Sequence, residues 1–290
     1  MTPSPGAPRG AGGGAGAGRL APALDGVAPL AGWRAVRVLA ALPPERPGAA
    51  PAGVRGWTTL ADALAPGAAE RWVAAVDDAL AAATGGAPVP RQVAPTYVLG
   101  WVLDALAQAG GTPYALLRRV PPLDLAGVAV RRAAPLGQPD AVVLLDAPSR
   151  LDARSWCLPA DRAAVRAGAR PAADEDGLAA ELGRALAAAG RAVEAAWSPR
   201  VRVGSLQRWG LLADAVDGVL GALGAARGDA AAGAADAHRV LAAAPAPLRR
   251  PGGVRPDGAG GWTRPRRSCC FAYAVSPALL CRTCPRLRLR

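Results

Sequence analysis

Residues 266–284 read RRSCCFAYAVSPALLCRTC, and this stretch holds four of the five cysteines of the chain. Cys269 and Cys270 are adjacent, ten residues follow, and Cys281 and Cys284 form a C-x-x-C pair. Packing does not explain this crowding, because a buried cysteine behaves as a small apolar side chain and gains nothing from other thiols nearby. Thiolates crowded in one loop repel one another unless a metal centre or disulfides neutralise them. The tail therefore predicts a metal or redox centre around which the end of the chain folds.

The rest of the sequence favours a metal over disulfides. The first 18 residues are rich in Gly, Ala and Pro and lack the continuous apolar core of a secretory signal. No window of about 18 residues is free of charges and helix breakers, so we expect no membrane span. Structural disulfides are rare in the reducing cytoplasm, and an odd number of cysteines suits a metal site plus one further thiol. We therefore expect a cytoplasmic protein with reduced thiols.

Three interpretations fit the cysteine spacing. A structural zinc site uses four thiolates on one ion, but adjacent side chains such as Cys269 and Cys270 diverge in extended structure and fit that geometry poorly. A [2Fe–2S] cluster divides its four thiolates between two irons, so neighbouring sulfurs need not meet at one point. A thioredoxin-like redox pair at Cys281 and Cys284 lacks its βαβ setting and leaves the vicinal pair unused. The spacing favours the cluster over zinc, and both over the redox pair.

Several other types of catalytic or binding site require residues that this chain lacks. The 290-residue chain contains no lysine, which excludes a Walker-type phosphate loop, a Schiff-base enzyme and a kinase-type lysine. The glycine-rich run at 12–18 follows no strand, so it is no dinucleotide fingerprint. His238 is the single histidine, and we expect it to be structural or exposed. Cys157 stands alone and is expected to be a packed, inert thiol.

The positive charge of the chain is concentrated around the cysteines. The net charge is +12, and the segment 249–290 contributes +9 of it through ten Arg and one Asp. One interpretation is a solvated basic tail. The other is that the arginines compensate an anionic metal–thiolate centre or attract an anionic partner. No helix-turn-helix, zinc-finger or aromatic-basic signature accompanies them, so we expect no nucleic acid as a partner.

The tail resembles the C-terminal signature of FhuF-type ferric-siderophore reductases. That family carries Cys-Cys-x10-Cys-x2-Cys, commonly after Arg-Arg-Ser and with a Tyr shortly after the vicinal pair, where this chain has Tyr273. All four ligand positions match. Beyond the tail the similarity is loose and includes a helix around Trp209. Two features depart from the pattern: the insert 271–280 is more apolar than expected, and the basic run 285–290 extends past the last cysteine.

The resemblance implies a site, a cofactor and an activity. Its ligands would be Cys269, Cys270, Cys281 and Cys284, holding one [2Fe–2S] cluster. The protein would then be an enzyme that reduces the ferric iron of a siderophore, of the hydroxamate type, by one electron and releases ferrous iron in the cytoplasm. A separate reductase, a ferredoxin or a flavodoxin would supply the electron. Two alternatives remain open: a structural zinc protein with a helical ligand- or partner-binding domain, and a generic iron–sulfur electron carrier.

The residues just before the vicinal cysteines are candidates for substrate contact. They could cover the cluster or meet an anionic chelate; alternatively they are solvated charges and one packed aromatic side chain. These residues are Trp262, Arg264, Arg266 and Arg267.

For the fold we expect an α+β protein, mainly a helical scaffold with a small sheet and a C-terminal cysteine-ligated iron–sulfur module. Apolar residues at helical spacing predict helices over 69–84, 96–109, 174–193, 205–224 and 229–244. Strands are predicted at 125–131 and 141–145. The chain would divide into a disordered segment 1–18, the scaffold 19–247, a Pro/Gly-rich linker 248–261 and the [2Fe–2S]-binding module 262–290.

Overall fold

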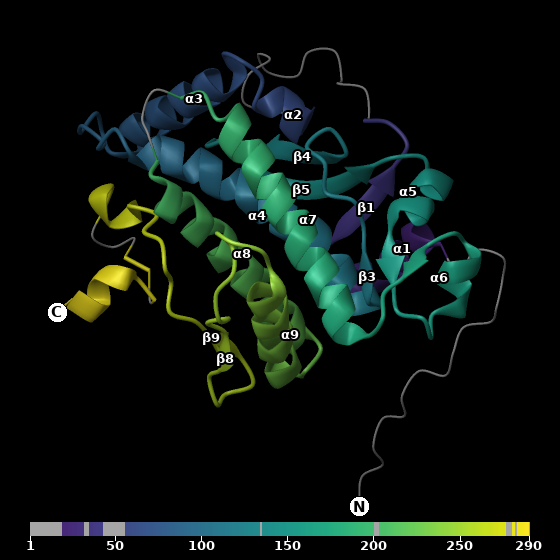
Figure 1. The fold of residues 1–290 in the computed structure, drawn as a ribbon. Coiled ribbons are helices and arrows are strands. Elements are labelled where there is room, and N and C mark those ends of the chain that lie inside the picture. The colour runs from purple at the N-terminus through teal and green to yellow at the C-terminus, as the bar shows by residue number, and fades with distance from the viewer. Residues whose placement is uncertain are drawn as a thin grey trace, which may run out of the picture.

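A long buried helix, α4 (Val93–Leu117), lies between a small sheet and a layer of helices in the computed structural model (Figure 1). The structure describes residues 19–31, 35–42, 56–133, 135–199, 203–276, 280–281 and 283–289. The expectation of disorder over 1–18 lies outside these residues. Because α4 contacts strand β5 (Gln138–Leu145) on one side and α8 (Ser205–Ala226) on another, it needs apolar residues around most of its circumference.

The other elements follow in chain order. They are α1 (Leu20–Ala31), β1 (Val36–Leu39), β2 (Gly56–Thr59), α2 (Leu60–Ala63), α3 (Ala68–Ala83), β3 (Arg119–Val120), β4 (Val128–Ala133), α5 (Pro148–Arg154), β6 (Trp156–Cys157), α6 (Arg162–Arg166), β7 (Arg170–Pro171), α7 (Glu175–Ala196), α9 (Ala230–Ala243), β8 (Arg255–Pro256), β9 (Trp262–Thr263), and the 3-10 turns η2 (Ala272–Ala274) and η4 (Pro285–Leu289).

The main sheet has the strand order β1-β5-β4-β2. Its centre is antiparallel, with Val130 of β4 opposite Val142 of β5, while β1 runs parallel to β5. Val128 and Val130 of β4 and Val142 and Leu144 of β5 belong to one apolar core with α4 and the surrounding helices. Two shorter sheets, β3-β6-β7 and β8-β9, complete the mixed architecture. The prediction of a mixed α and β fold with small sheets is therefore confirmed.

The predicted long helices are all present. Helices α3, α7, α8 and α9 begin and end within a few residues of their predicted limits. At the start of α7 the Asp174 carboxylate accepts a hydrogen bond from the backbone N–H of Gly177 at 2.7 Å and so caps the helix. Helix α4 differs: it begins before Pro95 and continues through Gly110, Gly111 and Pro113. Burial on all sides outweighs the weak helix propensity of those residues.

The predicted strands are also present, but shifted. The first begins at Val128, because the residues just before it form a turn in which the Asp124 carboxylate accepts a hydrogen bond from Gly127 N at 2.6 Å. The second begins at Gln138, three residues earlier than predicted, because its pairing with β4 extends to Gln138 along positions that alternate between exposed and half-buried. Both strands form the centre of the main sheet.

Among the described helices, α8 alone has the length and apolar composition of a membrane-spanning segment. However, 83% of the apolar window is buried within the protein, and α8 has its most extensive helix contacts with α4 and α9. Its apolar side chains are therefore used in packing against other helices, as in the core helix of a globular fold.

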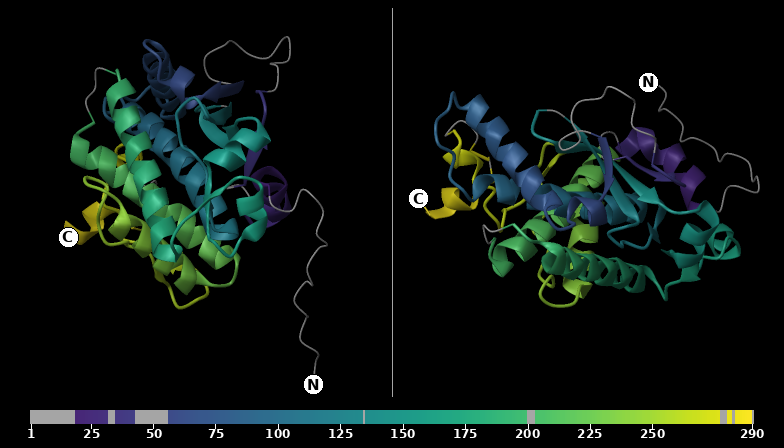
Figure 2. Two further views of the ribbon diagram at one scale, coloured as in Figure 1. Left: turned by 45° about the vertical axis from the view of Figure 1, so that its right-hand side comes forward. Right: turned by 90° about the horizontal axis from the view of Figure 1, so that it is seen from above.

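After α9 the chain returns along α8 and ends at the other end of that helix. Figures 1 and 2 show this yellow segment on the side of the helical layer away from α5 and α6. The residues predicted as a linker follow the surface of α8 and α9: Leu248 is buried, and Gly252 lies against the backbone of His238. The hairpin of β8 and β9 continues this path, which brings the cysteines to the N-terminal end of α8. The division into scaffold, linker and module stays a prediction.

Candidate metal centre

The tail lies in a groove that glycines open along one face of α8. A Cβ atom added at Gly221 would lie 2.9 Å from the ring of Trp262, and one added at Gly210 would lie 3.2 Å from the Cβ of Ser268. Real side chains rarely tolerate such contacts, so α8 needs these glycines for the tail to approach it. The tail consequently runs antiparallel to α8, with Ser268 near the start of the helix.

Two buried carboxylates of α8 hold this path in place. The Asp214 carboxylate accepts hydrogen bonds from Ser268 Oγ at 2.6 Å, from Ser268 N at 3.0 Å and from Arg267 N at 3.0 Å. The Asp217 carboxylate accepts one from Arg267 Nη1 at 2.7 Å and one from Gly253 N at 3.1 Å. Burial raises the pKa of Asp217, although Arg267 acts to lower it. The residues directly before the cysteines are therefore fixed by both backbone and side-chain contacts.

The four tail cysteines line one narrow recess beyond this anchor. Gln207 of α8 donates a hydrogen bond through Nε2 to the Cys269 carbonyl at 2.6 Å, and this fixes the start of the vicinal pair. The Sγ atoms of Cys270 and Cys281 lie 3.5 Å apart, and Cys284 N donates to the Cys281 carbonyl at 3.0 Å. The structure thus brings together all four residues that the sequence predicted as ligands.

Arg266 places a positive charge at the thiols. Its Nη1 donates to Cys281 Sγ at 3.4 Å, and its backbone N–H donates to the Thr283 carbonyl at 3.4 Å. Its side chain is 20% exposed, so water screens this charge only in part. A backbone donor serves the vicinal pair as well, since Phe271 N donates to Cys269 Sγ at 3.4 Å. These donors suit sulfurs that carry negative charge.

The thiols and the neighbouring phenol are poorly solvated. Burial raises the pKa of Cys269 and of Cys281, and the nearby cysteines raise both further. Burial, together with the charges of Cys270 and Cys281, raises the pKa of Tyr97 to about 12. Tyr97 therefore stays protonated and can donate a hydrogen bond at neutral pH. In such surroundings thiolates are stabilised by bound metal, whose positive charge replaces their protons.

One pair of the tail sulfurs has the spacing of a thiolate-held metal centre. On a tetrahedral ion with metal–sulfur bonds near 2.3 Å, two sulfurs stand about 3.8 Å apart, close to the 3.5 Å between Cys270 and Cys281. Among the described residues, no three His, Cys, Asp or Glu side chains form a group that could hold a metal ion. A single zinc ion needs all four sulfurs at one point, whereas a two-iron cluster needs them only in pairs. One such pair, Cys270 and Cys281, is in place in the structure.

The four candidates for substrate contact differ from one another in their surroundings. Arg267 forms the ion pair with Asp217, so it anchors the tail instead of facing solvent. Trp262 packs on α8, and the guanidinium of Arg264 lies 5.7 Å from the centre of its ring. Arg264 and Arg266 both line a cavity beside Cys270.

The residues of α8 and α4 that surround the tail were not among the predicted site residues. Asp214 and Asp217 stand three positions apart in a mostly apolar helix. They could have indicated a contact with another segment, because a buried carboxylate requires a partner. The aromatic residues Tyr97 and Trp101 of α4 carried no signal, since their spacing is also that of core positions. The remaining two candidates are placed as expected: Cys157 is fully buried in β6, where burial raises its pKa, and His238 is exposed on α9.

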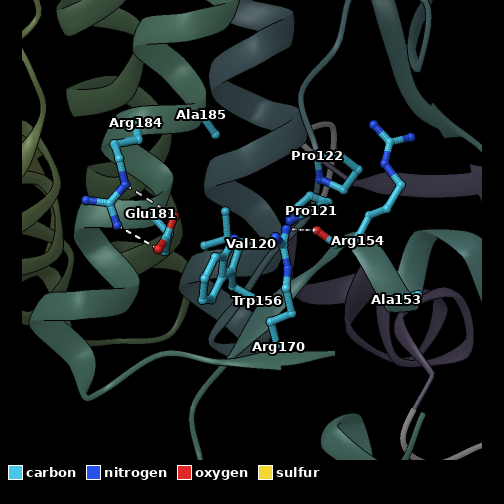
Figure 3. Close-up of a pocket in the computed structure, with 10 residues that line it drawn as sticks. All are labelled: Val120, Pro121, Pro122, Ala153, Arg154, Trp156, Arg170, Glu181, Arg184 and Ala185. Atoms are coloured by element: carbon cyan, nitrogen blue, oxygen red, sulfur yellow. Dashed lines mark hydrogen bonds and ion pairs between the residues drawn. The ribbon is translucent and has the colours of Figure 1, made fainter. Parts of the chain in front are cut away.

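A larger cleft of about 530 Å³ lies among β3, α5, β6 and α7, far from the tail (Figures 1 and 3). Its arginines have partners: Arg184 pairs with Glu181 at 2.6 Å, and Arg170 donates to the Arg154 carbonyl at 2.8 Å while lying over the ring of Trp156. Glu181 is the one acid among the described residues that line the cleft. The cleft therefore offers little chemistry beside that of the cysteine recess.

Comparison of the chain with protein-family models, with curated proteins and with solved structures finds no match. The cysteine recess and its surroundings therefore carry the functional conclusion.

Proposed function

We propose that the four tail cysteines hold a [2Fe–2S] cluster and that the protein reduces the ferric iron of siderophore complexes by one electron. The observation that carries this proposal is the recess lined by Cys269, Cys270, Cys281 and Cys284, with two of the sulfurs 3.5 Å apart. The resemblance of the tail to the FhuF-type signature supports the choice of cluster and substrate.

The bound cluster supplies a one-electron carrier, and the chain supplies its ligands and surroundings. A separate reductase, a ferredoxin or a flavodoxin is oxidised by one electron, and the siderophore iron gains that electron and changes from ferric to ferrous. Ferric ion is hard and is bound tightly by hydroxamate oxygens, whereas ferrous ion is held much less tightly. No proton transfer is needed, and the described contacts to sulfur in the recess are hydrogen bonds such as that from Arg266 Nη1 to Cys281 Sγ. The ferrous iron would be released in the cytoplasm.

The first test is the metal content of the anaerobically purified protein. We expect two iron and two labile sulfide per chain, together with the visible absorption of a [2Fe–2S] cluster. Cys269→Ser should remove or alter that absorption, whereas the matched control Cys157→Ser should leave it unchanged, because Cys157 is buried in β6. A colourless protein with stoichiometric zinc and no labile sulfide would replace the proposal with a structural zinc site.

The second test is the reaction itself. Dithionite-reduced protein is mixed with a ferric tris-hydroxamate, and ferrous iron is trapped by a coloured chelator. We expect the cluster absorption to return as ferrous iron forms, in equal electron equivalents. A cluster that reoxidises with ferricyanide but with no ferric siderophore would leave a generic electron carrier.

A further inference from the structure

A cavity of about 300 Å³ lies between α4, α8 and the tail, directly beside the cysteine recess. Cys270 and Arg266 line both spaces, so a molecule in the cavity would lie next to two residues of the recess. The volume is at the lower end of the range for ligand pockets, enough to take one face of a bulky molecule. Its other principal lining residues are Thr96, Tyr97, Trp101 and Arg264.

Three buried polar atoms of this cavity have no hydrogen-bond partner in the described part of the chain. They are Thr96 Oγ1, Arg264 Nη1 and Arg266 Nε; the last lies 3.8 Å from an Asp214 oxygen, within ion-pair range but beyond hydrogen-bond distance. A buried donor without a partner is destabilising, and folded proteins satisfy nearly all such groups. Because both guanidinium atoms can only donate, the missing partner must carry hydrogen-bond acceptors.

The wall formed by α4 is aromatic. The rings of Tyr97 and Trp101 lie 5.8 Å apart at 57°, and Leu211 of α8 adds an apolar surface. Aromatic side chains bury large areas of apolar ligand surface. The cavity thus combines donors with an apolar wall, which suits a molecule whose acceptor atoms are joined by methylene arms.

The charges around the cavity nearly cancel. Arg264 and Arg266 face Asp104 and Asp214, and Asp214 already accepts hydrogen bonds from the tail. A balanced site of this kind disfavours a ligand with a large net charge, because such a charge would lose its hydration without compensation. In a ferric tris-hydroxamate the charges of metal and ligands cancel, whereas a tris-catecholate stays strongly anionic.

We propose that this cavity binds the iron-bearing face of a ferric chelate of low net charge. The iron-bound oxygens accept hydrogen bonds from Arg264, Arg266 and Thr96, and the methylene arms pack against Tyr97 and Trp101. The iron would then lie beside Cys270, and the one electron that makes it ferrous would come from the separate reductase, ferredoxin or flavodoxin, which is oxidised by one electron. This inference rests on the proposed function, and it assigns that function a substrate site.

The test measures binding apart from turnover. The oxidised, cluster-loaded protein is titrated calorimetrically with a gallium tris-hydroxamate, a redox-inert analogue of the ferric complex. We expect Arg264→Gln to weaken binding by about tenfold or more and the isosteric Thr96→Val by roughly fivefold, as expected for lost hydrogen bonds. The matched control Arg286→Gln removes one positive charge from the same tail, outside the cavity, and should bind as the wild type does. The gallium tris-catecholate should bind more weakly than the hydroxamate.

The outcomes separate the site from the reaction. Cluster absorption and reoxidation by ferricyanide are recorded for every variant, and Thr96→Val remains the test where Arg264→Gln loads no cluster. If the wild type reduces ferric hydroxamate but both cavity variants bind the gallium complex unchanged, the site is wrong and the proposed function stands. Preferred binding of the catecholate would overturn the assignment of a low-charge ligand. Absence of a cluster in the wild type would instead refute the proposed function.

Discussion

At the scale of single residues, the Arg-Ser that precedes the vicinal cysteines is explained by its contacts with α8. Ser268 and Asp214 are both almost fully buried and are joined by a hydrogen bond of 2.6 Å. We predict that Ser268→Ala lowers the free energy of unfolding by about 1.5–3 kcal/mol, because a hydrogen bond to a buried carboxylate is lost. Urea denaturation of the holoprotein measures this.

The control for that measurement is Asp140→Asn, which removes a carboxylate from an exposed ion pair with Arg131. It should change stability by less than about 0.5 kcal/mol, as most surface substitutions do. The Ser268→Ala protein should also lose its cluster faster to a chelator than the wild type does. Equal stability of Ser268→Ala and wild type would contradict the anchoring role of this pair.

Arg266 is expected to set the reduction potential of the cluster. Its guanidinium donates to Cys281 Sγ, and a positive charge favours the more negative, reduced state of a thiolate-held centre. We predict that Arg266→Gln lowers the potential, by roughly 40 mV if about 1 kcal/mol of interaction is lost. A redox titration followed by visible absorption measures the shift. Arg255→Gln, in β8 at the other end of α8, should leave the potential unchanged; a rise in the Arg266 variant would contradict the prediction.

The sequence identified the ligand candidates but not their surroundings. Cysteine spacing is local, so Cys269 and Cys284 were recognisable without knowing the fold. The contacts of Asp214 with Ser268 join residues 54 positions apart, and only the packing of the tail on α8 brings them together. The same holds for Trp101, whose position beside Cys270 depends on how α4 crosses α8.

At the scale of elements, close helix contacts explain the glycines that helix propensity alone disfavours. A Cβ at Gly110 would lie 2.7 Å from a methyl carbon of Leu182, and one at Gly111 would lie 3.0 Å from Val219. These glycines let α4 approach α7 and α8, which is why α4 continues beyond its predicted end. Periodicity predicted that the helices exist, but their lengths depended on burial that only the assembled fold supplies.

The close approach of α8 and α9 predicts that two Gly→Ala substitutions change the stability of the protein in opposite directions. A Cβ at Gly233 would lie 2.6 Å from the Leu220 carbonyl oxygen and 2.9 Å from Gly224 Cα, both backbone atoms. Gly233→Ala should therefore destabilise the protein by about 1–3 kcal/mol, since the two helices must move apart. The matched control Gly26→Ala in α1, where no described atom outside the local helix backbone lies within 4 Å of the added Cβ, should stabilise by up to about 1 kcal/mol. Urea midpoints of both variants that moved in the same direction would contradict this packing.

At the scale of the whole molecule, the basic tail lies at one side of the protein. The segment 249–290 contributes +9 of the net +12, and its described residues lie away from α5 and α6 (Figure 1). Composition predicted this concentration of charge, but it did not separate buried from exposed arginines. Arg267 is used internally by Asp217, whereas Arg286 is exposed and lies over the ring of Tyr273. The exposed arginines are therefore the positive charges that a partner protein can contact.

That outer charge predicts how the electron donor associates. An acidic ferredoxin or flavodoxin should be steered towards the basic tail, and salt screens such steering because the Debye length falls from about 10 Å at 0.1 M to about 3 Å at 1 M. We predict that the second-order rate of cluster reduction by an acidic donor falls about tenfold or more over this range. Stopped-flow absorption measures the rate. Reoxidation by an uncharged quinone is the control and should depend little on salt, because no charge on the acceptor responds to the arginines. A donor rate that stayed constant or rose with salt would place donor docking away from the tail.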